Sequence, residues 1–174
     1  MSEFAVAAMG EDRPGIVAAF GDALLEAGAS IEDSSMTILG GQFAMLLLVQ
    51  GDLEADSLQS ALAPVAGRLG LMLEVRATEQ RGDGEGEERD DYVVAAYGPD
   101  RPGLVTALAH VLADSDVNIN DFGSRLSHNG VFAMWFNVTL PAGTDADDLT
   151  QRLRTAGGEL SLDVSVRQAD TESL

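Results

Sequence analysis

The chain has 174 residues, of which 45% are hydrophobic, and its 29 acidic against 10 basic residues give a formal net charge of −19. This length allows one large domain or two small ones, and two domains of about 80 residues would gain stability from a shared interface or from oligomerisation. The acidic balance and the lack of any Lys/Arg run exclude direct binding to DNA or RNA and disfavour docking on an anionic membrane.

The chain contains no cysteine, which excludes disulfides, thiolate catalysis and cysteine-based zinc sites. The N-terminal Met-Ser-Glu-Phe lacks the basic and then apolar pattern of a signal peptide. The longest apolar run, 43–49, is too short to cross a bilayer. We therefore expect a cytoplasmic protein with no membrane association.

The hydrophobic pattern of the first half predicts six secondary-structure elements. Gly40-Gly41 between two apolar stretches is typical of a hairpin turn. Proline suits the first turn of a helix, because its missing N–H would have no partner there, and glycine commonly follows the end of a helix. In chain order we expect a strand over 4–9, a helix that begins at Pro14 and ends before Gly28, strands over 31–39 and 42–49, a helix over 56–69 and a strand over 71–77.

The second half repeats the first. Residues 4–20 align with residues 92–108 at an offset of 88, with ten identities among seventeen positions. Both copies contain the tetrapeptide Asp-Arg-Pro-Gly, at residues 12–15 and 100–103. The chain is therefore a tandem duplication, and the second copy is expected to contain the same elements in the same order.

An acidic, glycine-rich segment separates the copies. Residues 79–91 contain seven acidic residues, three glycines and no apolar side chain. Self-repulsion and the conformational freedom of glycine favour an extended linker. We therefore expect a first domain at 1–78, a linker at 79–91, a second domain at 92–169 and a tail at 170–174.

The order β-α-β-β-α-β of each copy predicts an α+β fold with two tandem ferredoxin-like domains, each an antiparallel sheet with both helices on one face. The third strand of each copy, 43–49 and 131–136, is apolar on both of its faces. Such a pattern is expected where both faces of a sheet are covered. Because the helices cover one face, we expect another domain or subunit on the other, and hence a homodimer.

The repeated Asp-Arg-Pro-Gly, followed by Ile-Val or Leu-Val on this frame, resembles the ACT regulatory domains. The first copy, with 10–17, 31–34 and 39–43, is similar to the tandem-ACT proteins called glycine cleavage system transcriptional repressors. The resemblance implies a protein without catalysis or cofactor that binds a small amino acid effector, such as glycine or serine, where two domains meet. It also implies a partner protein that is controlled by the effector-bound state, either a separate regulator or a metabolic enzyme.

The contacts implied by the resemblance lie in the loop after the first strand and at the start of the second strand of each copy. In the second copy these residues are Gly98, Asp100, Arg101, Pro102, Gly103, Asn118 and Asn120. In the first copy they are Gly10, Asp12, Arg13, Pro14, Gly15, Ser30 and Glu32. The second copy is the better candidate, because its two asparagines offer donors and acceptors that suit a zwitterion, whereas Ser30 and Glu32 replace them in the first.

The residue types support such a site. The first turn of a helix has unpaired N–H groups and a partial positive charge, which stabilise a ligand carboxylate. Asp12 or Asp100 is suited either to pair with a ligand ammonium group or to cap the helix. Gly15 and Gly103 have no side chain and would let a ligand or a packed neighbouring strand approach the backbone closely. The alternative interpretation is structural, because Asp-x-Pro is an ordinary helix start that duplication would copy in any case.

Other residues indicate no further site. His110 and His128 lack a matched acidic cluster or cysteine, so no metal site is expected. Residues 145–148 are expected to begin a helix, and Trp135 to serve as a core or interface anchor. Two other functions remain open: an oligomerising interaction module without a ligand site and, less favoured, a small hydrolase, for which no convergent nucleophile or base is seen.

Overall fold

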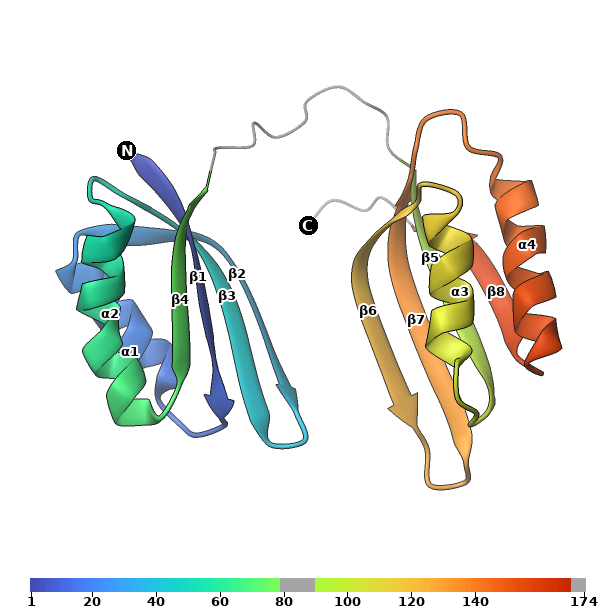
Figure 1. Cartoon of the computed structure of the whole chain (residues 1–174), viewed down its shortest axis with the longest axis horizontal. Coiled ribbons are helices and arrows are strands. Elements are labelled where there is room, and N and C mark those ends of the chain that lie inside the picture. Colours follow the sequence, from blue (N-terminus) through green and yellow to red (C-terminus); the bar gives the residue numbers. More distant parts are fainter. Residues whose placement is uncertain (79–89, 170–174) are drawn as a thin grey trace. The chain divides into compact units, whose positions relative to one another are not determined.

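A computed structural model describes residues 1–78 and 90–169, which lie in two separate compact units (Figure 1). The elements of the first unit are β1 (Ser2–Glu11), α1 (Ile16–Glu26), β2 (Ala29–Leu39), β3 (Gln42–Gly51), α2 (Ala55–Leu69) and β4 (Met72–Thr78). Those of the second are β5 (Asp90–Pro99), α3 (Leu104–Ala113), β6 (Asn118–Leu126), β7 (Val131–Leu140), α4 (Ala146–Glu159) and β8 (Asp163–Gln168). The predicted order of elements is confirmed in both copies.

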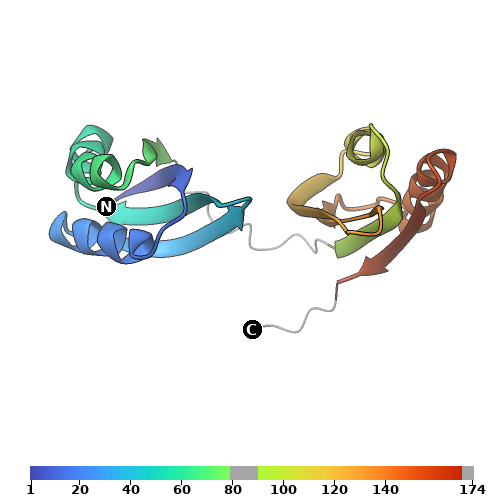
Figure 2. The same cartoon turned by 90° about the horizontal axis from the view of Figure 1, so that it is seen from below.

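Each unit contains one four-stranded sheet in which all paired strands are antiparallel, with the orders β2-β3-β1-β4 and β6-β7-β5-β8. The two helices of each unit cover the same face of its sheet, which leaves the opposite face without helices (Figure 2). This is the ferredoxin-like α+β fold expected from the sequence. The second strand of each copy lies at an edge of its sheet.

Burial follows the alternation along the strands. In β1 the side chains of Phe4, Val6 and Ala8 point toward the helices and are at most 3% exposed. They pack with a stripe of α1 that includes Phe20 and Leu24. Full burial of such a side chain contributes about 1.5–3 kcal/mol. An equivalent but separate core forms in the second unit, so each copy has its own hydrophobic core.

The first helix begins two residues later than predicted. Pro14 lies in the turn that precedes α1, and Gly15 is the N-cap, with a left-handed φ of 92°. Gly103 has the same φ at the start of α3. A residue in this conformation cannot belong to a right-handed helix, so the helix starts only after the glycine. By contrast, the hairpin turn is confirmed, because Gly40 and Gly41 both have positive φ, as a tight two-residue turn requires.

Strand β5 begins at Asp90, two residues before the expected start of the second domain. Most of the expected linker, 79–89, and the expected tail, 170–174, lie outside the described residues. The domain boundaries themselves therefore stay a prediction. Among the described residues, no helix combines the length and the apolar content that crossing a membrane requires.

Surface charge sets an expected response to salt. No charged side chain is buried among the described residues, so their charges, which are mostly acidic, lie on the surface and repel one another. Because salt screens exposed charges, raising NaCl from 0.02 to about 1 M should raise the midpoint of thermal unfolding by about 4–8 °C, which is about 1 kcal/mol for a domain of this size. KCl should give the same curve, since screening depends on ionic strength. A midpoint that is flat or falls with salt, measured by circular dichroism, would contradict this expectation.

Candidate functional site

The Asp-Arg-Pro-Gly loops follow the last residues of β1 and β5 and are fastened to the neighbouring hairpin turn. The backbone N–H of Asp12 donates to the carbonyl oxygen of Gly41 at 2.9 Å. In the second copy the N–H of Asp100 donates to the carbonyl oxygen of Gly130 at 3.3 Å. All side chains of the two tetrapeptides are exposed. Each loop is therefore anchored by its backbone while its side chains face solvent.

The aspartates of the loops do not cap the helices that follow. Neither α1 nor α3 has a side-chain hydrogen bond at its N-cap. The capping role considered for Asp12 and Asp100 is thus not adopted, and their carboxylates stay on the surface. The N–H groups in the first turn of each helix have no side-chain cap and remain able to bind an anion. In contrast, Asp145 does begin a helix as predicted, accepting from the N–H groups of Asp147 at 2.9 Å and Asp148 at 3.1 Å.

The glycines of the expected site have two different structural roles. A Cβ at Gly10 would lie 2.9 Å from the carbonyl oxygen of Gly70, and one at Gly98 would lie 2.6 Å from that of Ser161. Glycine at these two positions allows another backbone segment to pack closely. A Cβ at Gly15 or Gly103 would meet nothing within 4 Å, so there the requirement is the positive φ. The space over the start of both helices is therefore open.

The polar residues at the start of the second strands form different networks in the two copies. In the first, the Ser30 hydroxyl donates to Glu32 Oε1 at 3.1 Å. In the second, Asn118 Nδ2 donates to Asn120 Oδ1 at 2.6 Å, and Asn120 Nδ2 donates to Thr139 Oγ1 at 2.6 Å. Thr139 Oγ1 in turn donates to Asp91 Oδ1 at 2.5 Å, which extends the network across three strands.

Glu32 and Asn120 also share an unusual backbone position. The register of β2 against β3 shifts between Ile31 and Asp33, and that of β6 against β7 shifts between Ile119 and Asp121. Both residues therefore sit at a bulge, outside the regular pairing. Bulges are frequent next to functional sites because they redirect a side chain.

The expected site consists of the loop after the first strand and the polar residues at the start of the second strand. These two groups do not meet within one domain. Ser30 pairs with Gln50, which pairs with Glu3 near the start of β1, whereas Gly10 lies seven positions further along that strand. At about 3.3 Å per residue this is a separation of about 23 Å. Asn118 and Gly98 are separated in the same way in the second copy. The loop and the start of the second strand thus lie at opposite ends of the same sheet.

The two arginines of the loops differ in their surroundings. Arg13 Nη2 lies 3.3 Å from Glu11 Oε2, an exposed ion pair. The residue equivalent to Glu11 in the second copy is Pro99, and Arg101 makes no ion pair within the described part of the chain. The guanidinium of the second copy is accordingly the better placed to bind an external carboxylate.

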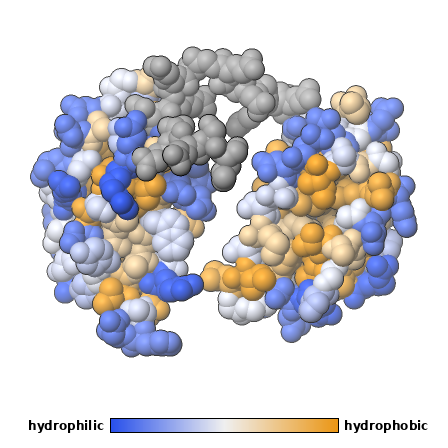
Figure 3. Space-filling model, turned by 180° about the vertical axis from the view of Figure 1, so that it is seen from behind, coloured by the Kyte–Doolittle hydropathy of each residue, from blue (hydrophilic) through white to orange (hydrophobic). Residues whose placement is uncertain are grey.

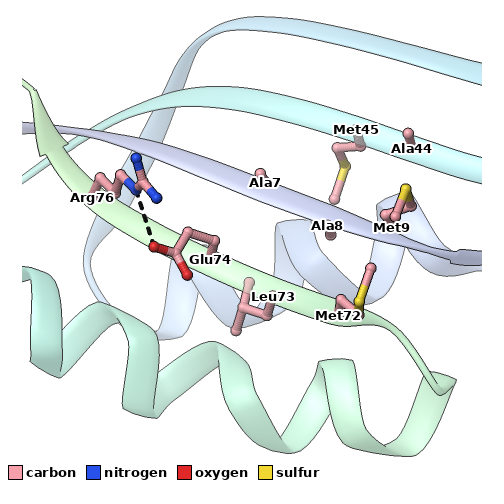
Figure 4. A pocket seen from close by; sticks show the side chains of 9 residues that line it. All are labelled: Ala7, Ala8, Met9, Ala44, Met45, Met72, Leu73, Glu74 and Arg76. Carbon is pink, nitrogen blue, oxygen red and sulfur yellow. Dashed lines mark hydrogen bonds and ion pairs between the residues drawn. The ribbon is translucent and has the colours of Figure 1, made fainter.

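The sequence predicted that another domain or subunit covers the helix-free sheet faces, and one of these faces has a hollow that the sequence did not indicate. In the first domain this face contains a hollow of about 610 Å³ that extends between Met9, Met72, Glu74 and Arg76 (Figure 4). Met72 on this face is 62% exposed. Met72, Glu74 and Arg76 lie on one side of β4, because side chains alternate between the two faces along a strand.

The equivalent face of the second domain carries a polar pair. The Tyr97 hydroxyl donates to Asp163 Oδ2 at 2.7 Å. This hydrogen bond, together with the negative charge of Asp163, raises the pKa of Tyr97 above its ordinary value. In neither described domain does any group of three or more His, Cys, Asp or Glu side chains converge on a possible metal position. His110 lies in the last turn of α3 and His128 in the turn after β6.

Comparison with known proteins identifies the domain type of both halves. The sequence profile of the ACT domain matches residues 3–76 and again residues 91–167. A UPF0237 protein of Methanopyrus kandleri is 39% identical over 79 residues, which are 45% of this chain and 87% of that protein. The glycine cleavage system transcriptional repressor of Escherichia coli is 34% identical over 77 residues, which cover 44% of this chain and only 40% of the repressor.

Two solved structures match this chain over both of its domains. A protein of unknown function from Galdieria sulphuraria has a TM-score of 0.84 and 28% identity, with 97% of this chain and 98% of that one covered. A candidate glycine cleavage system transcriptional repressor has a TM-score of 0.73 and 18% identity, with 97% of both chains covered. At 18% identity, the likeness to this second structure shows a shared fold and nothing further.

The positive φ of the loop glycines gives a stability test. Gly15→Ala should lower the free energy of unfolding by about 1–2 kcal/mol, because an L-residue is strained in the left-handed region. Gly21→Ala is the control in the same helix, where a Cβ meets nothing within 4 Å and alanine should add about 0.5–1 kcal/mol. Urea unfolding curves measure both, and a Gly15→Ala protein as stable as the parent would contradict the assigned backbone role.

Proposed function

The chain belongs to the ACT-domain family, and on that basis we propose that it is a non-catalytic regulatory protein that binds a small amino acid, such as glycine or serine, and thereby controls a partner protein. The observation that carries the proposal is the chemistry of the second Asp-Arg-Pro-Gly loop, residues 100–103. Its Arg101 is exposed and has no ion pair within the described residues, and it lies next to a helix start without a side-chain cap.

The chemistry of this loop fits a zwitterion. A ligand carboxylate would accept from the guanidinium of Arg101 and from the free N–H groups in the first turn of α3. The ammonium group would find acceptors in the carboxylate of Asp100 and in the amide oxygens of the asparagines on β6. The open space over Gly103 allows the ligand to approach the backbone.

The separation between the second Asp-Arg-Pro-Gly loop and the start of β6 makes self-association part of this proposal. Glycine or serine is far shorter than the distance of about 23 Å from the loop to the start of β6. One ligand therefore contacts both groups only if the loop of one chain lies beside the start of β6 in another. Such a site requires that the two sheets run in opposite strand directions, as a two-fold axis perpendicular to the strands provides.

The relatives suggest what the protein controls. The relative from Escherichia coli is a repressor of the glycine cleavage system, which favours a partner connected with amino-acid metabolism. With ten arginine and lysine residues against 29 acids, this chain is poorly suited to binding DNA by itself, so any effect on transcription would pass through a separate regulator. We place this activity in the cytoplasm.

A second candidate function, an interaction module that has lost its ligand, is favoured by the exposed apolar surface. Val17 on α1 and Met36 and Ile38 on β2 are each 52% exposed. Figure 3 shows hydrophobic side chains gathered on one side of the first domain among hydrophilic ones. An interaction module of this kind would self-associate without binding any amino acid.

Calorimetric titration with the amino acids separates the two candidates. Glycine or serine should release or absorb heat on binding, and Arg101→Ala should weaken that binding by roughly 10–100-fold, because a hydrogen bond to a charged group contributes about 1.5–3 kcal/mol. Arg13→Ala, the matched change in the first copy, should bind as the parent does. If none of the twenty amino acids binds, or if only Arg13→Ala loses affinity, the sensor proposal fails at the second site.

Mixing two inactive variants tests whether the site is shared. Arg101→Ala removes the loop group and Asn118→Ala removes the group on β6, so each variant alone should bind poorly. After mixing and exchange of subunits, a mixed dimer contains one site with both groups intact, and about a quarter of the total sites should recover. Recovery measured by titration supports the shared site, and a mixture that binds no better than its components contradicts it.

A further inference from the structure

The hairpin turn between β6 and β7 contains an asparagine that is followed directly by a glycine. The four asparagines of the sequence are Asn118, Asn120, Asn129 and Asn137, and of these Asn129 alone precedes a glycine. A backbone nitrogen can attack the side-chain amide carbon of the asparagine before it, and glycine hinders this attack least because it has no Cβ. The turn therefore contains a dipeptide that is able to react with itself.

Solvent reaches the whole of this turn. Residues 127–130 are all exposed, and a Cβ built on Gly130 would meet nothing within 4 Å. The other three asparagines, Asn118, Asn120 and Asn137, lie in strands, and the side-chain amide of each donates a hydrogen bond to another side chain. The residue that follows each of them belongs to the paired sheet. Asn129 is therefore the asparagine whose surroundings are open to reaction.

The turn requires its glycine but not its asparagine. Gly130 has a φ of 79°, in the left-handed region that favours glycine. Asn129 does not have a positive φ, so the backbone at that position accepts ordinary L-residues. The first copy makes the corresponding turn with Gly40-Gly41 and no asparagine. The reactive amide is thus a property of the second copy that the hairpin does not demand.

The hydrogen bonds of Ser127 bear on the reaction in two ways. The Gly130 N–H donates to the carbonyl oxygen of Ser127 at 3.0 Å, so its nitrogen must leave this bond before it attacks. The Ser127 hydroxyl donates to Asn129 Oδ1, the oxygen on which negative charge develops when the nitrogen adds to the amide carbon. A donor at that position favours the addition. Because exposed loop tips open readily, we expect a slow reaction in the folded chain.

The reaction balances with water as its co-reactant and hydroxide as its catalyst. Hydroxide removes the proton of the Gly130 amide, and the nitrogen forms a bond to Cγ of Asn129. The side-chain nitrogen takes a proton from water, which regenerates hydroxide, and leaves as ammonia. Water then opens the cyclic imide at either carbonyl. One opening gives aspartate, and the other gives isoaspartate, whose main chain runs through the former side chain and is longer by a methylene group.

The same glycine anchors the second Asp-Arg-Pro-Gly loop. Its carbonyl oxygen accepts from the N–H of Asp100 at 3.3 Å. An isoaspartate at position 129 lengthens the chain immediately before Gly130 and so displaces that carbonyl. The first loop has the corresponding bond between Asp12 and Gly41, at 2.9 Å, but no asparagine beside it. The modification therefore acts on the loop of one copy.

We propose that Asn129 is a site of spontaneous modification in the folded protein. Through an imide with Gly130 it converts to aspartate and isoaspartate, and the isoaspartate form releases the second loop from its bond to the turn. This inference does not depend on whether the loop binds an amino acid. Where the proposed function holds, the released loop is the one that contains Arg101, so ligand affinity at the second site falls as the protein ages.

Ageing the full chain at mildly alkaline pH tests the modification. The protein should gain the mass difference between a hydroxyl and an amino group, and peptide mapping should place the change at Asn129. The rate should rise in proportion to the hydroxide concentration. Asn129→Gln should keep its mass, because a longer side chain closes the ring less readily. Asn137→Gln, the same change in a strand, should age as the parent does.

Circular dichroism verifies that the ageing protein and both variants stay folded. A folded protein that keeps its mass while urea-unfolded protein is modified at Asn129 would overturn the proposal, because the closed turn would then protect the amide. Modification that maps mainly to another asparagine overturns it as well.

Hydrogen exchange followed by NMR tests the release of the loop. In the isoaspartate form the amide of Asp100 should exchange faster than in fresh protein, whereas the amide of Asp12 should not change. Asn129→Asp introduces the charge without lengthening the backbone and should leave the exchange at Asp100 as in the fresh parent.

Unchanged exchange at Asp100 in the isoaspartate form overturns the release of the loop, and equal acceleration in Asn129→Asp overturns the role of the longer backbone. Neither measurement contains an amino acid ligand. A failure here is therefore distinct from a failure of the calorimetric test of the proposed function.

Discussion

Two helices packed against a single face of a four-stranded antiparallel sheet are the constraint on which the rest of this protein depends. The alternating side chains of the central strands, such as Phe4, Val6 and Ala8 in β1, enter the core between sheet and helices. Their neighbours on the same strands must then point to the opposite face, where no helix covers them. Each domain therefore has a buried face that is fixed by folding and a second face whose chemistry folding leaves open.

Duplication placed this scaffold twice in one chain, and the two copies differ mainly where the scaffold permits it. The loop glycines keep the same left-handed φ of 92° in both copies, and the sheets keep the same strand order. The side chains on the open faces and around the loops have diverged instead. Arg13 is paired with Glu11 whereas Arg101 has a proline as that neighbour, and Met9 corresponds to Tyr97.

The antiparallel register explains why a single domain does not complete the expected site. The first and second strands run in the same direction on either side of the third, so the end of β1 and the start of β2 are necessarily at opposite ends of the sheet. In the proposed function, a ligand that joins the two groups must bridge separate copies. Binding and assembly are then linked, because a ligand that contacts both copies stabilises the dimer by mass action.

The sequence by itself determined the duplication, the order of elements, the hairpin turn at Gly40-Gly41 and the family, because periodicity and turn chemistry depend on residues close together in the chain. Only the tertiary structure decided the rest. It set the start of α1 after Gly15, the burial of Met45 against the exposure of Met72, and the distance from Gly10 to Ser30. These features depend on backbone conformation and on strand pairing between distant residues, and sheet register is a property of the assembled sheet that no local pattern contains.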